Sequence, residues 1–223
     1  MNDRLRRDHE SCARSNQFLT DNLVDFNTGI VKTKRQALEA AVNDTESKDA
    51  VYSGGFGESS MEFEQKETSR SVLRADVASI ADMAEGMEPD FDGISDLFRF
   101  KRNLSDVALL ALARAFHTAS ADFEADFIAY GLSATFRADL NTHADEFEAA
   151  TNAASAAKGD RVGAGAALAA AVKLEMQLKR TMDPIVRTKY AGNIAKLTAW
   201  ASAFHVEKAP KKKDPPTPPP PTP

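Results

Sequence analysis

Residues 105–131 carry the sequence signals for both ends of one long helix. Ser105 is a residue type that caps a helix N-terminus by accepting a hydrogen bond from a backbone N–H group. Gly131 is suited to the left-handed conformation that ends a helix, and Leu132 would then contact Phe127 across the closing turn. The pattern therefore predicts one helix over 105–131.

A second helix is predicted to begin almost at once, because Ser133 is a further N-cap candidate just beyond Gly131. Two long helices joined by so short a connection run antiparallel. Apolar residues from Phe136 to Ala157 recur at alternating steps of four and three, which places them on one face of a helix. This hairpin predicts an all-α fold.

A first apolar stripe of the same spacing runs through residues 5–42, and Asn27-Thr28-Gly29 interrupts it as a predicted break or kink. Residues 45–58 lose the periodicity and contain the run Tyr52-Ser53-Gly54-Gly55-Phe56-Gly57, which is too glycine-rich for a stable helix interior. We therefore predict a loop over 45–58 and a new helix that begins at Ser59.

The C-terminal half is rich in small side chains, since alanine makes up about a third of residues 108–172. Glycines within 158–165 predict a kink or short break, and Pro184 is expected to open a new turn or to bend its helix. A last amphipathic stretch covers 190–204. Together the segments predict an antiparallel up-and-down bundle of four long helices with extra short segments, in a single domain over 1–209.

The composition changes abruptly at Pro210. Lys211-Lys212-Lys213-Asp214 is followed by proline and threonine up to Pro223. Such a segment takes polyproline II or disordered conformations and does not join a core, so we predict a disordered tail over 210–223. Capture of this tail by a partner with an aromatic groove is the alternative to a solvated tail.

Composition narrows the classes of function. The net charge of −5 includes a basic end from Lys208 onward, which leaves −8 for residues 1–207, and an acidic body is a poor binder of nucleic acid. Cys12 is the single cysteine, so the chain forms no internal disulfide. Because neither a signal-peptide pattern nor an apolar membrane span is present, we expect a soluble cytoplasmic protein.

His9, Cys12 and His143 form the candidate metal site of the sequence. His9 and Cys12 are three residues apart on one helix face, and His143 lies on the apolar stripe of another helix. Imidazole and thiolate groups bind zinc and copper. The alternative is that the histidines lie at the edge of the core beside a buried thiol, because the chain has no Cys-x-x-Cys motif and no Glu-x-x-His pair.

Carboxylates gather in two short stretches, within 122–126 and within 139–148. Paired acids can transfer protons when burial separates their pKa values, but acids between the apolar positions of a helix usually form its solvated face. The chain has neither a Gly-x-Ser-x-Gly elbow nor a phosphate-binding loop that ends in Gly-Lys-Ser/Thr. We therefore expect no catalytic residues and no cofactor.

Several segments share residues with one group of helical proteins. They are Phe98-Arg99-Phe100-Lys101-Arg102, Ser105-Asp106, Leu109-Leu110, Ala113-Arg114-Ala115-Phe116, Gly131-Leu132-Ser133-Ala134-Thr135-Phe136, Met182-Asp183-Pro184-Ile185-Val186 and Ala199-Trp200. On these residues the C-terminal half resembles a group of bacterial alanine-rich helical-bundle proteins of unknown function. The resemblance implies a helical bundle and implies no chemistry.

The sequence thus favours a non-enzymatic interaction or structural protein that binds a protein partner, or a second copy of itself, through its helix faces. The alternative is a helical bundle that holds a metal ion or small cofactor, with His9, Cys12 and His143 as ligands.

Overall fold

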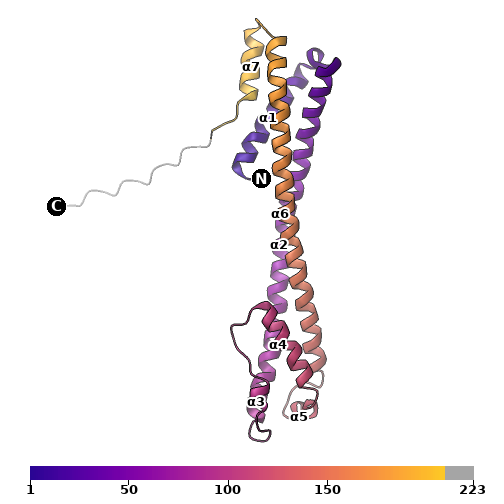
Figure 1. Cartoon of the computed structure of the whole chain (residues 1–223), viewed down its shortest axis with the longest axis vertical. Coiled ribbons are helices and arrows are strands. Elements are labelled where there is room, and N and C mark those ends of the chain that lie inside the picture. Colours follow the sequence, from indigo (N-terminus) through magenta and orange to yellow (C-terminus); the bar gives the residue numbers. More distant parts are fainter. Residues whose placement is uncertain (209–223) are drawn as a thin grey trace, which may run out of the picture. The chain divides into compact units, whose positions relative to one another are not determined.

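The computed structural model describes residues 1–208, and every regular element in them is helical (Figure 1). In chain order the elements are α1 (Asp3–Asp21), the 3-10 helix η1 (Leu23–Phe26), α2 (Gly29–Met87), α3 (Ile94–Leu97), α4 (Asp106–Ala119), α5 (Glu124–Ala129), α6 (Phe136–Lys189) and α7 (Ile194–Phe204). The predicted all-α fold is confirmed. The predicted tail over 210–223 lies outside the described residues.

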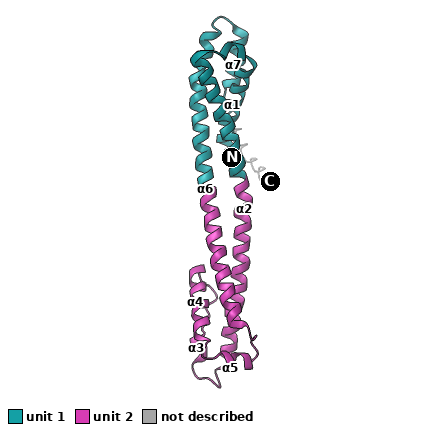
Figure 2. Cartoon of the chain, turned by 90° about the vertical axis from the view of Figure 1, so that its right-hand side faces the viewer, with its two compact units in different colours: residues 1–53, 163–223 teal, residues 54–162 magenta. Residues whose placement is uncertain are grey.

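The chain divides into two compact units, each containing part of α2 and part of α6 (Figure 2). Unit 1 is formed by residues 1–53 and by the chain from Gly163 onward, and unit 2 by Gly54–Val162. Within each unit the stretch of α2 lies beside a stretch of α6 that runs in the opposite direction, as the predicted antiparallel bundle requires. The single domain over 1–209 stays a prediction.

In unit 1, α1, η1 and α7 pack against these two long helices around an aromatic-rich core. Its buried members are Cys12, Phe18, Leu19, Phe26, Leu38, Val42, Met182, Val186, Tyr190 and Trp200. The ring of Phe18 lies 5.3 Å from that of Trp200 and 6.2 Å from that of Tyr190, measured between centroids. α1 and α7 thus share one aromatic contact layer, in which tilted and edge-on rings add to the gain from burial.

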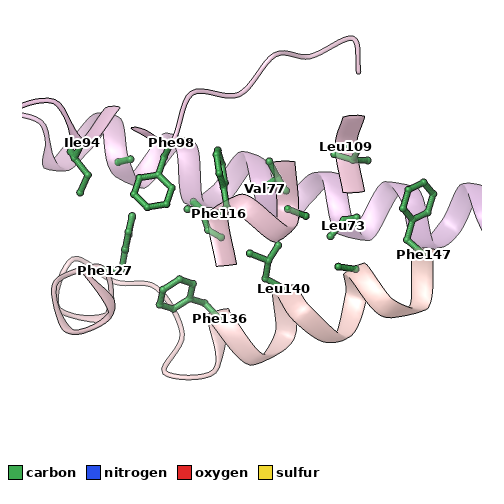
Figure 3. Close-up of a cluster of buried hydrophobic side chains, with 14 of the residues drawn as sticks. Leu73, Val77, Ile94, Phe98, Leu109, Phe116, Phe127, Phe136, Leu140 and Phe147 are labelled. Atoms are coloured by element: carbon green, nitrogen blue, oxygen red, sulfur yellow. The ribbon is translucent and has the colours of Figure 1, made fainter. Parts of the chain in front are cut away.

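In unit 2 the core is closed by the connector between α2 and α4 (Figure 3). Residues 89–101 are irregular but rich in apolar side chains, a sequence pattern that predicts a strap packed across one end of the bundle, and the burial of Ile94 and Phe98 confirms this. The ring of Phe98 lies 5.1 Å from the rings of both Phe116 and Phe127. The strap is therefore part of the hydrophobic core.

Both predicted ends of the 105–131 segment are confirmed. The Ser105 Oγ atom accepts a hydrogen bond from the Ala108 N–H group at 3.3 Å. Gly131 has a φ angle of 118°, and the Leu132 N–H group donates to the Phe127 carbonyl oxygen at 3.0 Å. This is the hydrogen bond that closes a glycine-terminated helix.

The segment between those ends is two helices, so the prediction of one continuous helix is wrong. α4 ends at Ala119, and α5 begins at Glu124. The buried Ser120 hydroxyl donates to the His117 carbonyl oxygen, which is the local competition by which serine disrupts helices. The turn also lets Phe123 place its ring 6.2 Å from that of Phe91 and 6.4 Å from that of Phe98.

The break predicted at 27–29 is confirmed, because α2 begins at Gly29 after η1. The loop over 45–58, the helix start at Ser59 and the break over 158–165 are wrong, because α2 and α6 pass through these segments as continuous helices. Without a proline, a glycine costs a helix only about 1 kcal/mol, and packed helical turns on both sides offset that cost. Pro184 likewise lies inside α6.

These helical glycines predict different outcomes for two alanine substitutions. A methyl group added at Gly57 meets no described atom within 4 Å beyond its own helix backbone, whereas one at Gly165 lies 3.2 Å from the Tyr52 ring. We expect Gly57→Ala to raise the free energy of unfolding by about 0.5–1 kcal/mol, and Gly165→Ala to lose that gain to crowding. Urea unfolding compares the two variants, and an equal gain in both would contradict the expectation.

Candidate functional site

Two of the three predicted metal ligands lie on α1 in unit 1, facing α6. His9 Nδ1 is 3.1 Å from Oε1 of Glu175, and Cys12 Sγ is 3.4 Å from Sδ of Met176. Cys12 is fully buried, and its burial raises the pKa of the thiol to about 12. Burial thus favours the neutral thiol, whereas a metal ion binds the thiolate.

The third predicted ligand, His143, belongs to unit 2. Its Nδ1 atom lies 2.6 Å from Oδ2 of Asp76, and both side chains are partly exposed. Within residues 1–208 no three or more His, Cys, Asp or Glu side chains form a group that could hold a metal ion. The shared metal site of His9, Cys12 and His143 stays a prediction, and the metal content of the purified protein would check it.

Glu175 is a buried acid that the sequence analysis did not single out. It has no exposed surface, and burial raises the pKa of its carboxyl group, while the hydrogen bond with His9 opposes that shift. The same hydrogen bond is the largest cause of a raised pKa at His9. A buried carboxylate needs such a partner, because an uncompensated charge in the core is costly.

Lys179 is a buried base that was also missed, one helical turn after Glu175. Its Nζ atom donates to Ser11 Oγ at 2.7 Å and to the Phe204 carbonyl oxygen at 3.1 Å, and it lies 4.5 Å from the centre of the Phe204 ring. Burial lowers the pKa of this lysine. A cation at the last carbonyls of α7 is also favoured by the helix dipole.

We call His9, Ser11, Ser15, Glu175 and Lys179 the buried polar cluster. Ser15 completes it by donating to the Ala203 carbonyl oxygen at 3.3 Å. The acid of the cluster, Glu175, connects α6 to α1. Its base, Lys179, connects α6 both to α1 and to the C-terminal end of α7. The polar atoms of the cluster bond to other groups of unit 1, so the cluster holds α1, α6 and α7 in place relative to one another.

The His9–Glu175 contact predicts a pH dependence of stability. Because the pKa of His9 is raised above its ordinary 6.5 in the folded protein, its contribution is fully present below pH 6.5 and is lost as pH rises through the folded pKa. We therefore expect the difference in unfolding free energy between the wild type and His9→Gln to become smaller as pH rises through that pKa. Urea unfolding at a series of pH values measures it, and a difference that grows with pH would contradict the assignment.

The two carboxylate-rich stretches lie on the surface of unit 2. Arg114 contacts Asp145 and, at 3.2 Å, Glu148, and Arg137 contacts Glu124. The remaining members of the two stretches are Asp122, Asp126, Asp139 and Glu146, all exposed or partly exposed. This placement agrees with the solvated-face interpretation.

Four exposed apolar side chains come from η1, from the start of α2 and from the start of α7, segments that lie at one end of unit 1 (Figure 1). The exposed fractions are 94% for Val24, 79% for Ile194, 69% for Ile30 and 40% for Leu23. We call these four residues the end cluster.

Polar contacts hold the segments that carry the end cluster together. The Tyr190 hydroxyl donates to Oδ2 of Asp25 at 2.7 Å, and the Lys196 ammonium group donates to Asn22 Oδ1. η1 is thereby fixed beside the first turn of α7. Exposed apolar side chains that gather in one region of a protein typically mark an interaction surface.

No helix within residues 1–208 combines the length and the apolar character that a membrane crossing needs.

Comparison with models of protein families, with curated proteins and with solved structures finds no match to this chain. The resemblance of the C-terminal half to bacterial alanine-rich helical bundles stays a prediction.

Proposed function

We propose that this chain is a non-enzymatic interaction protein that binds another protein through exposed helix faces. The observation that carries the proposal is the end cluster of unit 1, where Val24, Ile30 and Ile194 are largely exposed. Burying one such side chain in an interface is worth about 1.5–3 kcal/mol. The four residues together can therefore supply a large part of a binding free energy.

The setting of the end cluster also suits binding. The Tyr190–Asp25 and Lys196–Asn22 contacts fix the turns before a partner arrives, so that less conformational freedom is lost on association. Charged groups belong to the same segments: Lys189 pairs with Asp25 at 3.6 Å, and the Lys196 ammonium group lies 5.9 Å from the centre of the Tyr190 ring. An apolar centre with a polar rim is the usual composition of a protein–protein interface.

The non-enzymatic part of the proposal is supported by the buried polar cluster. Its acid and its base, Glu175 and Lys179, have almost no exposed surface and already bond to protein groups. A general acid or base must instead reach a proton on a substrate.

Photo-crosslinking in the native cell tests the proposal. A photoreactive residue is placed at Val24 or at Ile194, with the exposed polar Asn43 of the same unit as the matched control. We expect protein adducts at the two apolar positions and none at Asn43. Adding Val24→Asp should abolish the adduct formed at Ile194, because one apolar surface binds the partner. Adducts absent from all positions, or insensitive to Val24→Asp, would overturn the proposal.

A further inference from the structure

Unit 1 contains a groove of about 470 Å³ between the start of α1 and the middle of α6. Leu5, Val172 and Met176 supply its apolar lining, and Arg4, Lys173 and Arg180 supply positive charge, against the single acid Asp8. We call this the basic groove. None of the three cations has an ion-pair partner in the part of the chain that the structure describes.

Unit 2 presents a ridge of opposite character on the outer face of α2. Met61 is 70% exposed, and the exposed residues Glu58 and Glu64 lie one helical turn before and after it. Thr68 continues the same face. We call Glu58, Met61, Glu64 and Thr68 the acidic ridge, and its two acids form no ion pair within residues 1–208.

The ridge and the groove match in length. The ridge extends over ten residue steps of α2, about 15 Å at the rise of an α-helix. The α6 side of the groove, from Ala169 to Arg180, extends over eleven steps, about 16 Å. A helix with an apolar centre and charged flanks fits a groove with an apolar lining and opposite charge, which is a common mode of recognition between proteins.

The charges of the two units favour the same pairing. Unit 2 contains 20 Asp and Glu residues against 10 Lys and Arg, and the sequence assigned to unit 1 contains 13 acidic against 18 basic residues. Unit 2 of one molecule is therefore attracted to unit 1 of another. Such complementarity speeds encounter and selects the partner.

We propose that a second copy of this chain places the acidic ridge of its unit 2 in the basic groove of unit 1. Met61 then packs on Leu5, Val172 and Met176, while Glu58 and Glu64 face the cations of the groove. The inference adds a self-association surface to the proposed function, and it can fail while the end cluster still binds a different protein.

Sedimentation analysis of the full chain at low and at high salt tests the inference. We expect self-association that weakens as salt rises, because exposed charges are screened. The groove variant Arg4→Glu with Arg180→Glu, and the ridge variant Glu58→Lys with Glu64→Lys, should each associate at least about tenfold more weakly. An equimolar mixture of the two variants should regain association, since reversed charges then face each other.

The matched control is Asp82→Lys with Glu85→Lys, which makes the same charge change on exposed positions of α2 well beyond the C-terminal end of the ridge. Circular dichroism checks that every variant keeps its helices. A control that weakens association as much as the ridge variant would show that only net charge matters, and it would overturn the inference. A wild-type chain that stays monomeric at low salt, or variants that fail to recover association when mixed, would also overturn it.

Discussion

Phe98→Ala is expected to destabilise unit 2 by about 3–5 kcal/mol, the usual cost of removing a fully buried ring. Phe98 is only 1% exposed, and its ring lies within 5.1 Å of the rings of Phe116 and Phe127. Its removal leaves a cavity where the strap, α4 and α5 meet, because Phe98 follows α3 and the other two rings come from α4 and α5. Urea unfolding monitored by far-ultraviolet circular dichroism measures the loss.

The adjacent residue provides the control. Leu97 is 51% exposed, so Leu97→Ala should change the free energy of unfolding by no more than about 0.5 kcal/mol. The two substitutions occur one residue apart in the same short segment, so local helix propensity contributes similarly to both. Equal losses would contradict the packing of the strap into the core.

The ends of helices were predictable because their signals are local. The Ser105 cap and the Gly131 turn each involve residues within one turn of the chain, and the structure has both hydrogen bonds. The strap was predictable for a different reason. A connector that carries Ile94 and Phe98 must cover them, since large apolar groups are worth about 1.5–3 kcal/mol each when buried.

The continuity of α2 and α6 was not predictable from periodicity. Thr45, within the stretch that lost its apolar pattern, and Ser59, just after it, lie buried in place of large apolar residues, so a helix is present without the usual stripe. The break in the helix after Ala119 was not predicted, for the opposite reason. The apolar spacing from Phe116 to Phe127 fits a continuous helix, whereas the turn is favoured by the packing of Phe123 on the strap and by the Ser120 hydroxyl bond.

The contacts of the buried polar cluster join residues that lie far apart in the sequence. His9 and Glu175 are separated by 166 residues, and Ser11 and Lys179 by 168. Local spacing shows that His9 shares a face with Cys12, but it does not show which helix lies opposite. A signal was nevertheless present, because Glu175 and Lys179 occupy helical steps between the apolar residues Val172 and Met182. Charged residues at such positions indicate buried partners.

Lys179→Ala is expected to lower the free energy of unfolding by about 2–4 kcal/mol and to loosen α7. The substitution removes the packed stem of the side chain, and it leaves Ser11 Oγ and the Phe204 carbonyl oxygen without their buried donor. Trp200, the single tryptophan of the chain, lies buried on α7. Its fluorescence should therefore shift to longer wavelength and become accessible to a soluble quencher.

Lys179→Met separates the effect of packing from that of charge. Methionine keeps most of the stem against the Phe204 ring and removes a buried cation, so its cost should be clearly smaller than that of alanine. Lys173→Ala, on an exposed position of the same helix, is the control and should leave Trp200 protected. If neither substitution at Lys179 changes the emission of Trp200, the ammonium group does not hold α7, and the aromatic contacts with Phe18 and Phe204 suffice.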